Sequence, residues 1–354
     1  MEPYIILAIN PGSTSTKIAV YENTRKLFDA SLAHDDQELS RYARVIDQFD
    51  MRTECVLKAL AEHQVDLKRL SCAVGRGGML PPVKAGGYLV GDRMKKVLAE
   101  GSSSEHVSNL GALIADSIAA PLGIPAYIYD AVSSDELDDV ARITGIPEVV
   151  RQSFCHVLNS KATARKAAEA AGRSYEEMNF IVAHIGGGIS VSAHKKGRIV
   201  DVITADGGPF SPERSGSVPL TYVVDMCYSG TYTKAQMLKK IAGMGGLKAY
   251  LGTHDCREIE RMIADGDTRA AMLYDAQSYQ IAKGIGELSP VLKGDVDLII
   301  LTGGMAYSAA LTQAIGERVS FIGPVAVMPG ENELEALALG AYRIMTGQEE
   351  ASEF

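Results

Sequence analysis

A glycine-containing hairpin occurs twice in the chain, about half a chain length apart, and this repeat constrains the fold most. Residues 5–22 (IILAINPGSTSTKIAVYE) read as an aliphatic strand, a turn with Gly12 and a second strand. Residues 179–196 (NFIVAHIGGGISVSAHKK) repeat that order, with Gly186 in the place of Gly12. The repeat predicts two homologous halves. The alternative is two unrelated hairpins that both use glycine in their turns.

Helix signals and short aliphatic runs fill the rest of the chain. Capping residues followed by apolar residues at helical spacing predict helices, and aliphatic runs between them predict strands. The predicted helices cover 51–63 (capped by Asp50), 104–120 (Ser104), 161–171 (Ser160, ended by Gly172), a long segment from Thr268, and a last one from Leu334 that stops at Gly347. The predicted strands cover 70–74, 126–129, 297–302 and 325–328. The alternation predicts an α/β fold with mixed sheets covered by helices.

Length and charge narrow the classes of function. A chain of 354 residues has the length of two ordinary domains. Lys and Arg number 35 against 44 Asp and Glu, a net charge of −9. That balance lacks the basic footprint of a protein that binds nucleic acid or an anionic membrane. We therefore expect the protein to bind neither nucleic acid nor a membrane. Any anionic ligand would be held by a few individually placed cationic side chains.

The cysteines indicate a reducing compartment. Five cysteines, with no C-x-x-C pair, argue against a disulfide framework and against a thiolate zinc site. The first residues, Met1–Tyr4, carry no basic segment, and no apolar run reaches the ~20 residues of a membrane span. The sequence thus predicts a soluble, cytoplasmic protein.

Three glycine turns suggest a phosphate-bearing ligand, although the Walker and Rossmann glycine signatures are absent. The segment Asn10–Lys17 offers amides, hydroxyls and a lysine that can converge on phosphate oxygens. The turn Gly186–Gly188 has no side chains to obstruct a phosphate. Gly303 and Gly304 follow an aliphatic strand and are predicted to open a helix whose N-terminus suits a nucleotide.

With these motifs the chain resembles a known family, the acetate and butyrate kinases, in the fold group that also holds actin, sugar kinases and the Hsp70 ATPase domain. The resemblance covers nearly the full length. In length and in the residues of these motifs, the chain looks closer to the butyrate kinases than to the acetate kinases. The resemblance is carried by INPGSTSTK at 9–17, GRGG at 75–78, IYDA at 128–131, FCHVLNSKATARK at 154–166, AHIGGGISV at 183–191, PFSPERSGSVP at 209–219, LTGGMAYS at 301–308 and PGENELEALALGA at 329–341.

The resemblance implies a fold and an assembly. It implies two duplicated ribonuclease-H-like (actin-like ATPase) domains flanking a nucleotide-binding cleft. The first would span residues 1–150, with the C-terminal helix at 335–354 returning to it, and the second would span 151–334. A homodimer or a higher homo-oligomer is expected.

The resemblance also implies which residues handle phosphates and metal. Asn10, Ser13, Ser15 and Lys17 match the family's first phosphate loop, which acts on the β- and γ-phosphates. Asn10 and Glu333 match residues that hold Mg²⁺ or its water shell, and Mn²⁺ is expected to substitute. The glycines expected to line the nucleotide are Gly186, Gly187, Gly188, Gly303 and Gly304.

The implied catalytic residues are two arginines, an aspartate and a histidine. Arg76 and Arg214 match the arginines that face the substrate carboxylate and the transferring phosphoryl group, partners that suit a forked donor. Asp130 matches an aspartate near the reacting carboxylate, and His184 a histidine that donates to phosphoryl oxygens. His156 matches a second histidine more loosely, because FCH stands here in place of FH, and its role stays open.

These residues predict a Mg²⁺-dependent carboxylate kinase that converts butanoate and ATP to butanoyl phosphate and ADP. A carboxylate is ionised at pH 7 and needs no general base. Alternatives are kinases of branched-chain acids such as isobutyrate, of propionate or of acetate, and, more remotely, an actin- or Hsp70-like ATPase module. The preferred acid, the direction of flux, the nucleotide and the oligomer size stay open. We further expect Gly78, where acetate kinases carry a bulky aliphatic residue, to widen the pocket for butyrate.

Overall fold

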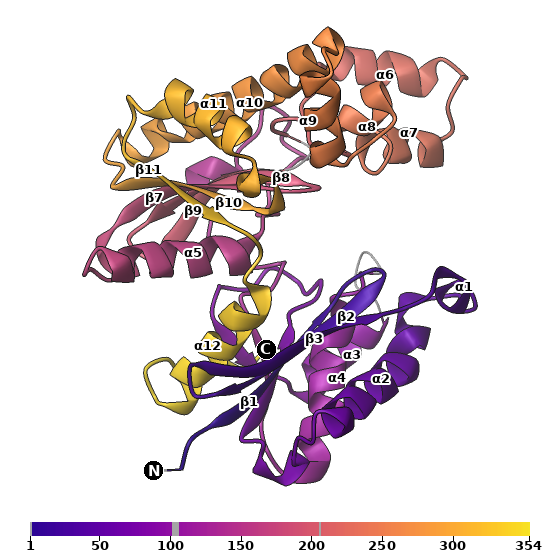
Figure 1. Ribbon diagram of the computed structural model, residues 1–354, viewed down its shortest axis with the longest axis vertical. Helices are drawn as coiled ribbons and strands as arrows, with labels where there is room; N and C mark the ends of the chain where they lie inside the picture. The colour runs from indigo at the N-terminus through magenta and orange to yellow at the C-terminus, as the bar shows by residue number, and fades with distance from the viewer. Residues whose placement is uncertain (1, 101–105, 205–206) are drawn as a thin grey trace. The chain divides into compact units, whose positions relative to one another are not determined.

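The computed structural model describes residues 2–100, 106–204 and 207–354, and the chain divides into two compact units (Figure 1). Unit 1 comprises Met1–Asp135 and Asn332–Phe354, and unit 2 comprises Glu136–Glu331. Unit 2 thus begins before residue 151, where the sequence places the boundary. Three contacts tie residues 136–150 to the rest of unit 2: Lys161 to Glu136 at 2.7 Å, the Asp138 N–H to the Val200 carbonyl at 3.0 Å, and Arg198 to Asp138 at 3.1 Å.

Unit 1 is built on a six-stranded sheet with the order β3-β2-β1-β4-β6-β5. Every residue of the central strand β1 is buried, which agrees with its apolar run from Ile5 to Ile9. Helices cover both faces of this sheet, α12 on one and α2 and α4 on the other (Figure 1). The elements are β1 (Ile5–Pro11), β2 (Ser15–Glu22), β3 (Arg25–Ala33), α1 (Asp36–Leu39), α2 (Phe49–Glu62), β4 (Cys72–Arg76), β5 (Gly87–Leu89), α3 (Asp92–Glu100), α4 (Asn109–Ala119), β6 (Ala126–Tyr129) and α12 (Glu333–Met345).

Unit 2 is built on a five-stranded sheet with the order β11-β10-β7-β8-β9. Alternate residues of β7 enter two cores: Ile181 and Ala183 pack with α10 and α11, whereas Phe180 and Val182 pack with α5. The elements are α5 (Val157–Ala170), β7 (Asn179–Ile185), β8 (Ile189–Lys195), β9 (Arg198–Ile203), α6 (Leu220–Tyr228), α7 (Lys234–Ile241), α8 (Gly246–Leu251), α9 (Cys256–Ala264), α10 (Thr268–Leu288), β10 (Leu298–Gly303), α11 (Ala309–Val319) and β11 (Val325–Pro329).

Short 3₁₀ turns connect several of these elements. They are η1 (Val45–Gln48), η2 (Leu67–Arg69), η3 (Ala120–Leu122), η4 (Asp139–Arg142), η5 (Tyr175–Glu177), η6 (Pro290–Leu292) and η7 (Gly304–Tyr307).

The two sheets repeat one topology. In unit 1, β1 pairs antiparallel with β2 and parallel with β4, which pairs parallel with β6. In unit 2, β7 pairs antiparallel with β8 and parallel with β10, which pairs parallel with β11. The predicted duplication of an α/β domain is therefore confirmed, and the alternative of two unrelated hairpins is excluded.

Helix starts depart from the predictions more than helix ends. The predicted cap Ser160 lies buried inside α5, which begins at Val157, and Ser104 lies outside the described residues. The helix predicted to open at Gly303 and Gly304 is the short 3₁₀ helix η7, and the α-helix α11 begins only at Ala309, where the Ser308 hydroxyl accepts the N–H of Leu311. Polar side chains supply many possible caps, and only the packing of the helix selects one.

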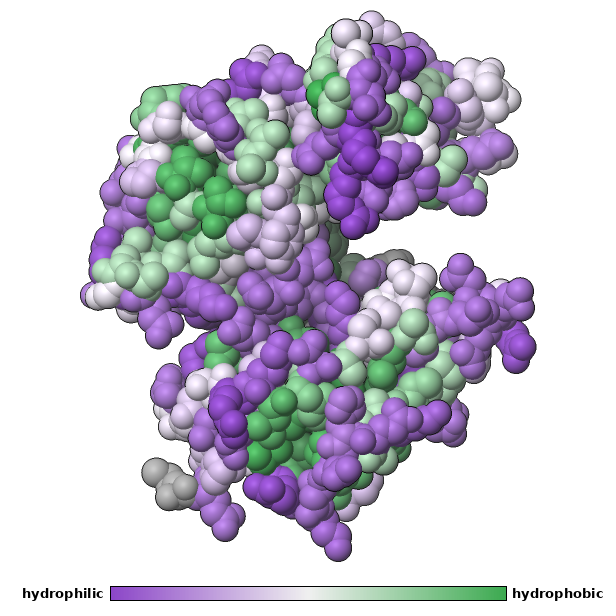
Figure 2. Space-filling model, in the orientation of Figure 1, coloured by the Kyte–Doolittle hydropathy of each residue, from purple (hydrophilic) through white to green (hydrophobic). Residues whose placement is uncertain are grey.

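In the orientation of Figure 2, each unit shows both hydrophilic residues and broad patches of hydrophobic residues. Within residues 2–100, 106–204 and 207–354, no helix is both long enough and apolar enough to cross a bilayer.

Candidate active site

In unit 1 the predicted phosphate loop is the turn between β1 and β2. Asn10 and Lys17 are directly opposite in the antiparallel pair, so their side chains share one face of the sheet. Asn10 is buried and Lys17 is exposed. The Gly12 N–H donates to the Ser15 carbonyl at 2.7 Å and closes the turn, leaving Ser13 exposed.

A buried arginine that the sequence analysis missed lies against this turn. Arg52, in α2, has an exposed fraction of 0%. Its guanidinium donates to the carbonyl oxygens of Gly12 at 2.9 Å, Ser13 at 3.1 Å and Ser15 at 3.2 Å. Burial lowers the pKa of Arg52. Its position gave no signal in the sequence, because arginine on a predicted helix is ordinarily a surface residue.

Three predicted site residues meet at the end of β4. Arg76 Nη1 lies 3.1 Å from Glu333 Oε2 and 3.4 Å from Asn10 Oδ1, and the Asn10 amide donates to the same Glu333 oxygen. Arg76 Nε is buried and has no hydrogen-bond partner among the residues that the structure describes. The described protein leaves this buried donor unsatisfied.

The same cluster can be tested for its fit to Mg²⁺. Mg²⁺ binds oxygen, usually through one or two carboxylates with waters and substrate phosphates completing its shell. The Glu333 carboxylate and the Asn10 amide oxygen are donors of that kind, held together at one point. They fit the ion as a partial shell. The described part of the chain holds no group of three or more His, Cys, Asp or Glu side chains able to bind a metal alone.

Asp130 directly follows β6 in a strained backbone conformation. Its φ is +43°, in the left-handed region that few residues other than glycine adopt. The Asp130 carboxylate accepts the Gly86 N–H at 2.9 Å, and the Asp130 N–H donates to the Gly86 carbonyl at 3.0 Å. Such backbone outliers concentrate at functional sites, which agrees with the predicted role of Asp130.

The expectation for Gly78 is wrong. A Cβ on Gly78 would lie 2.5 Å from Asn109 Oδ1 and 2.8 Å from Leu98 Cδ2. The Asn109 oxygen is fixed there because it accepts the Met79 N–H at 2.8 Å. Gly78 therefore makes room for a buried side chain of unit 1 and not for substrate.

In unit 2, His184 stacks on His156. The two rings are 3.7 Å apart and 8° from parallel. Asn159 Nδ2 donates to Thr302 Oγ1 at 3.1 Å and to His184 Nδ1 at 3.0 Å. Since Nδ1 accepts, the neutral imidazole of His184 carries its proton on Nε2, 3.6 Å from Glu331 Oε1. That N–H is the donor its predicted role requires.

The triple-glycine turn of unit 2 lies beside these residues. A Cβ on Gly186 would lie 3.4 Å from His184 Nε2, and one on Gly188 would lie 2.9 Å from Arg214 Cζ. Ser211 donates from its hydroxyl to the Gly187 carbonyl at 2.6 Å and accepts the Arg214 N–H at 3.2 Å, which fixes the loop that carries Arg214. Unit 2 thus brings the predicted His184, Gly186–Gly188 and Arg214 together.

The predicted nucleotide glycines at the end of β10 differ from each other. Gly303 has φ +93°, and a Cβ there would lie 2.4 Å from the Ile185 carbonyl oxygen, so only glycine fits. Gly304 is exposed, with open space where a Cβ would lie. This space at the start of η7 is accessible to a ligand.

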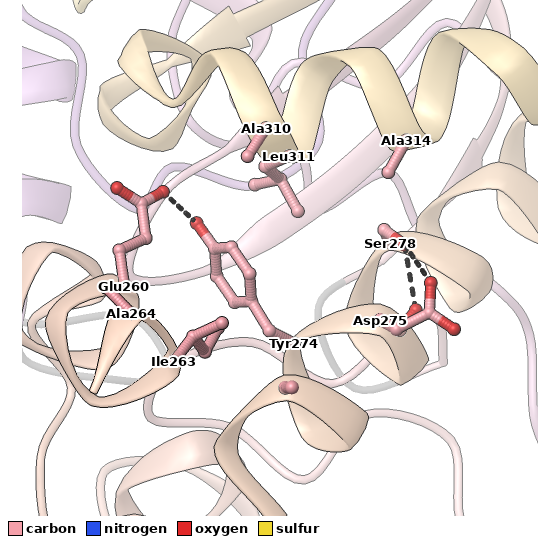
Figure 3. Close-up of a pocket in the computed structure, with 10 residues that line it drawn as sticks. Glu260, Ile263, Ala264, Tyr274, Asp275, Ser278, Ala310, Leu311 and Ala314 are labelled. Carbon is pink, nitrogen blue, oxygen red and sulfur yellow. Dashed lines mark hydrogen bonds between the residues drawn. The ribbon is translucent and has the colours of Figure 1, made fainter. Parts of the chain in front are cut away.

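A separate cavity of about 410 Å³ lies between α9, α10 and α11 (Figure 3). Its lining is largely apolar, with Ile263, Ala314 and Leu311 among its side chains. The Tyr274 hydroxyl donates to Glu260 at 2.9 Å, which the Ser308 hydroxyl also contacts. None of the predicted site residues lines this cavity.

Comparison with known proteins identifies the family. The model of the acetokinase family matches residues 146–335. The chain is also 48% identical to butyrate kinase 2 of Clostridium acetobutylicum over 351 residues, 99% of each protein. The chain belongs to the acetokinase family. The resemblance seen in the motifs is thereby confirmed over the full length.

Solved structures confirm the fold of this acetokinase family member. The crystal structure of Porphyromonas gingivalis acetate kinase matches with a TM-score of 0.79 at 19% identity, covering 98% of this chain and all of that one. A propionate kinase from Francisella tularensis matches with a TM-score of 0.74 at 17% identity, over 95% and 98% of the two chains. The predicted fold class, two duplicated actin-like ATPase domains, is confirmed.

Proposed function

We propose that this acetokinase family member transfers a phosphoryl group between ATP and butanoate, giving butanoyl phosphate and ADP. The observation that carries the proposal is the 48% identity to a butyrate kinase across 99% of both chains. The arginines, amides and imidazole of the two units agree with it. These groups bind and neutralise anions, which is the main task in phosphoryl transfer.

Each cluster of predicted residues then has a role. The turn after β1, with Asn10, Ser13, Ser15 and Lys17, binds the terminal phosphates. Arg76 and Arg214 bind the carboxylate and the transferring phosphoryl group, and the Nε2–H of His184 donates a hydrogen bond to a phosphoryl oxygen. The butanoate oxygen attacks phosphorus as the bond to ADP breaks, without a general base because the acid is already ionised.

Glu333, Asp130 and the glycine turns bind the metal, the acid and the nucleotide that take part in this reaction. Glu333 and Asn10 hold Mg²⁺, which neutralises phosphate charge when it is bound. Asp130 orients the reacting carboxylate. The glycine turns line the nucleotide; they are Gly186, Gly187, Gly188, Gly303 and Gly304.

A hydroxamate assay tests this function, because hydroxylamine traps acyl phosphates. The purified protein is incubated with ATP, Mg²⁺ and acetate, propionate, butyrate, isobutyrate or valerate, with a control lacking acid. We expect the highest kcat/KM with butyrate. A preference for one of the other acids contradicts butyrate specificity. ADP release without acid and without hydroxamate favours an ATPase module instead.

Metal dependence has its own test. Activity should disappear with a chelator and return with Mg²⁺ or Mn²⁺, and Glu333→Gln should raise the Mg²⁺ concentration needed for half-maximal rate. Full activity in the chelator would overturn the metal assignment.

We also propose that the chain assembles with further copies of itself in a reducing compartment such as the cytoplasm. All five cysteines are free thiols. Helix α6 buries none of its residues, and Leu220, Tyr222, Val224 and Tyr228 are 73%, 65%, 55% and 88% exposed. A helix so apolar is normally covered.

Light scattering can test the assembly. The wild-type mass should be at least twice that of one chain, and Leu220→Glu combined with Tyr222→Glu should lower it. The control is Met272→Glu on the exposed face of α10, which should leave the mass unchanged. A monomeric wild type contradicts the proposal.

A further inference from the structure

Arg52 has an environment that a structural arginine rarely has. Its side chain is fully buried, yet no carboxylate among the described residues pairs with it. Apart from the three turn carbonyls, its donors reach Gln48 Oε1 at 3.0 Å and Thr16 Oγ1 at 3.0 Å, both neutral. Buried charges are ordinarily paired with an opposite charge. Here a positive charge is held against the back of the turn with neutral acceptors only.

The contacts of Arg52 determine where the amides of the turn point. The described chain has no cis peptide bonds, and in a trans peptide unit the C=O and N–H point in opposite directions. The carbonyls of Gly12 and Ser13 face Arg52, so the N–H groups of Ser13 and Thr14, which belong to the same peptide units, face away from it. Neither N–H has a hydrogen-bond partner in the described chain.

Both residues of this amide pair are also exposed. Two successive free amides that point to solvent form a small anion-binding concavity. The unpaired charge of Arg52 behind them raises the local positive potential. Geometry and charge therefore favour the same ligand, an oxyanion such as a phosphate group.

We propose that Arg52 is the positioning residue of the phosphate turn: by gripping its carbonyls it holds the Ser13 and Thr14 amides toward the terminal phosphates of the nucleotide. This inference rests on the proposed function, which places those phosphates at the turn. It assigns a role to a residue that lies 40 positions from Gly12 and belongs to none of the glycine motifs.

Calorimetric binding without acid tests the inference. The probes are Mg²⁺·ATP and AMP, which lacks the β- and γ-phosphates. Arg52→Met should weaken Mg²⁺·ATP binding by at least about tenfold, since the amides lose their orientation and the turn its charge. AMP affinity should stay within about twofold. The matched control is Lys58→Met, which removes an exposed charge from the same helix and should change neither affinity.

Arg52→Lys covers the case in which the methionine variant does not fold. A lysine keeps the charge, but its ammonium cannot grip the separate carbonyls as the planar fork does. It should lose at least about threefold in Mg²⁺·ATP affinity with AMP unchanged. The inference is overturned if folded variants bind Mg²⁺·ATP like wild type, or if ATP and AMP affinities fall equally. Failure of the proposed function would be observed differently, because the wild-type protein would then bind Mg²⁺·ATP but form no butanoyl hydroxamate.

Discussion

At the scale of single residues, substitution of Arg76 or Arg214 is expected to have the largest effect on the reaction. Arg76→Ala and Arg214→Ala should each lower kcat/KM by roughly 10³-fold, because arginines that stabilise a transferring phosphoryl group have effects of that size. Lysine at either position should restore little, since it lacks the bidentate fork. The measurement is the hydroxamate assay with butyrate, with a thermal melt to verify folding.

The control for this pair is Arg25→Ala. Arg25 is an exposed arginine that pairs with Glu22 at the neighbouring hairpin turn, so its loss should leave activity unchanged. Near-wild-type kcat/KM in either alanine variant would remove that arginine from the site.

The surroundings of Gly78 predict a loss of stability on substitution, whereas the sequence comparison predicts a change in acid preference. Gly78→Val should destabilise unit 1 by about 1–3 kcal/mol, because the added carbons overlap buried atoms of Asn109 and Leu98. Urea denaturation measures the loss, and Gly91→Val is the control, since Gly91 has nothing within 4 Å of its Cβ position. A stable Gly78→Val protein that prefers shorter acids would restore the pocket interpretation.

At the scale of elements, the buried histidine of strand β8 predicts how stability depends on pH. His194 is fully buried, with Tyr175 OH 2.8 Å from Nδ1 and Ser192 Oγ 2.9 Å from Nε2. Burial, with the nearby Lys161 and Arg165, lowers its pKa well below 6.5. The native state therefore keeps His194 neutral where the unfolded chain would protonate it.

The sign follows from proton linkage. Below pH 6.5 the unfolded chain binds the extra proton, so the free energy of unfolding should fall as the pH falls, by up to about 1.4 kcal/mol per pH unit for this group. Urea denaturation from pH 7.5 to 5 measures the slope. His194→Gln should reduce it, whereas replacing the exposed His254 by Gln should not. Equal slopes in wild type and His194→Gln contradict the assignment.

At the scale of the whole molecule, the two units differ in how the chain builds them. Unit 2 is one continuous segment, whereas unit 1 needs its last helix from the C-terminus. In α12, Leu337, Ala338 and Ala341 are completely buried, and a Cβ on Gly340 would lie 2.5 Å from the Tyr129 ring. Without α12 one face of the unit 1 sheet would be exposed.

We therefore expect residues 136–331 to fold alone and residues 1–135 not to. Joining 332–354 to residue 135 through a flexible Gly/Ser linker should restore folding of unit 1. Near-UV circular dichroism during a thermal melt is the measurement, with a cooperative transition as the sign of folding. A cooperative transition in residues 1–135 alone would contradict this view of α12.

The sequence determined those features that depend on neighbours along the chain. Alternating apolar residues and glycine turns specify the two hairpins, because strand periodicity and turn conformation are local properties. The short motifs also carried enough information to indicate the acetokinase family and to nominate Arg76, His184, Arg214 and Glu333. The catalytic roles of these residues stay predictions.

Only the tertiary structure decided what lies behind those motifs. The Arg76–Glu333 pair joins residues 257 positions apart, Arg52 grips a turn 40 positions away, and Asn109 fills the space beside Gly78. No local pattern encodes such contacts, because they arise when helices pack on a sheet and bring distant side chains to one point. A glycine or an arginine reads the same in the sequence whether its neighbour in space is a ligand or the protein itself.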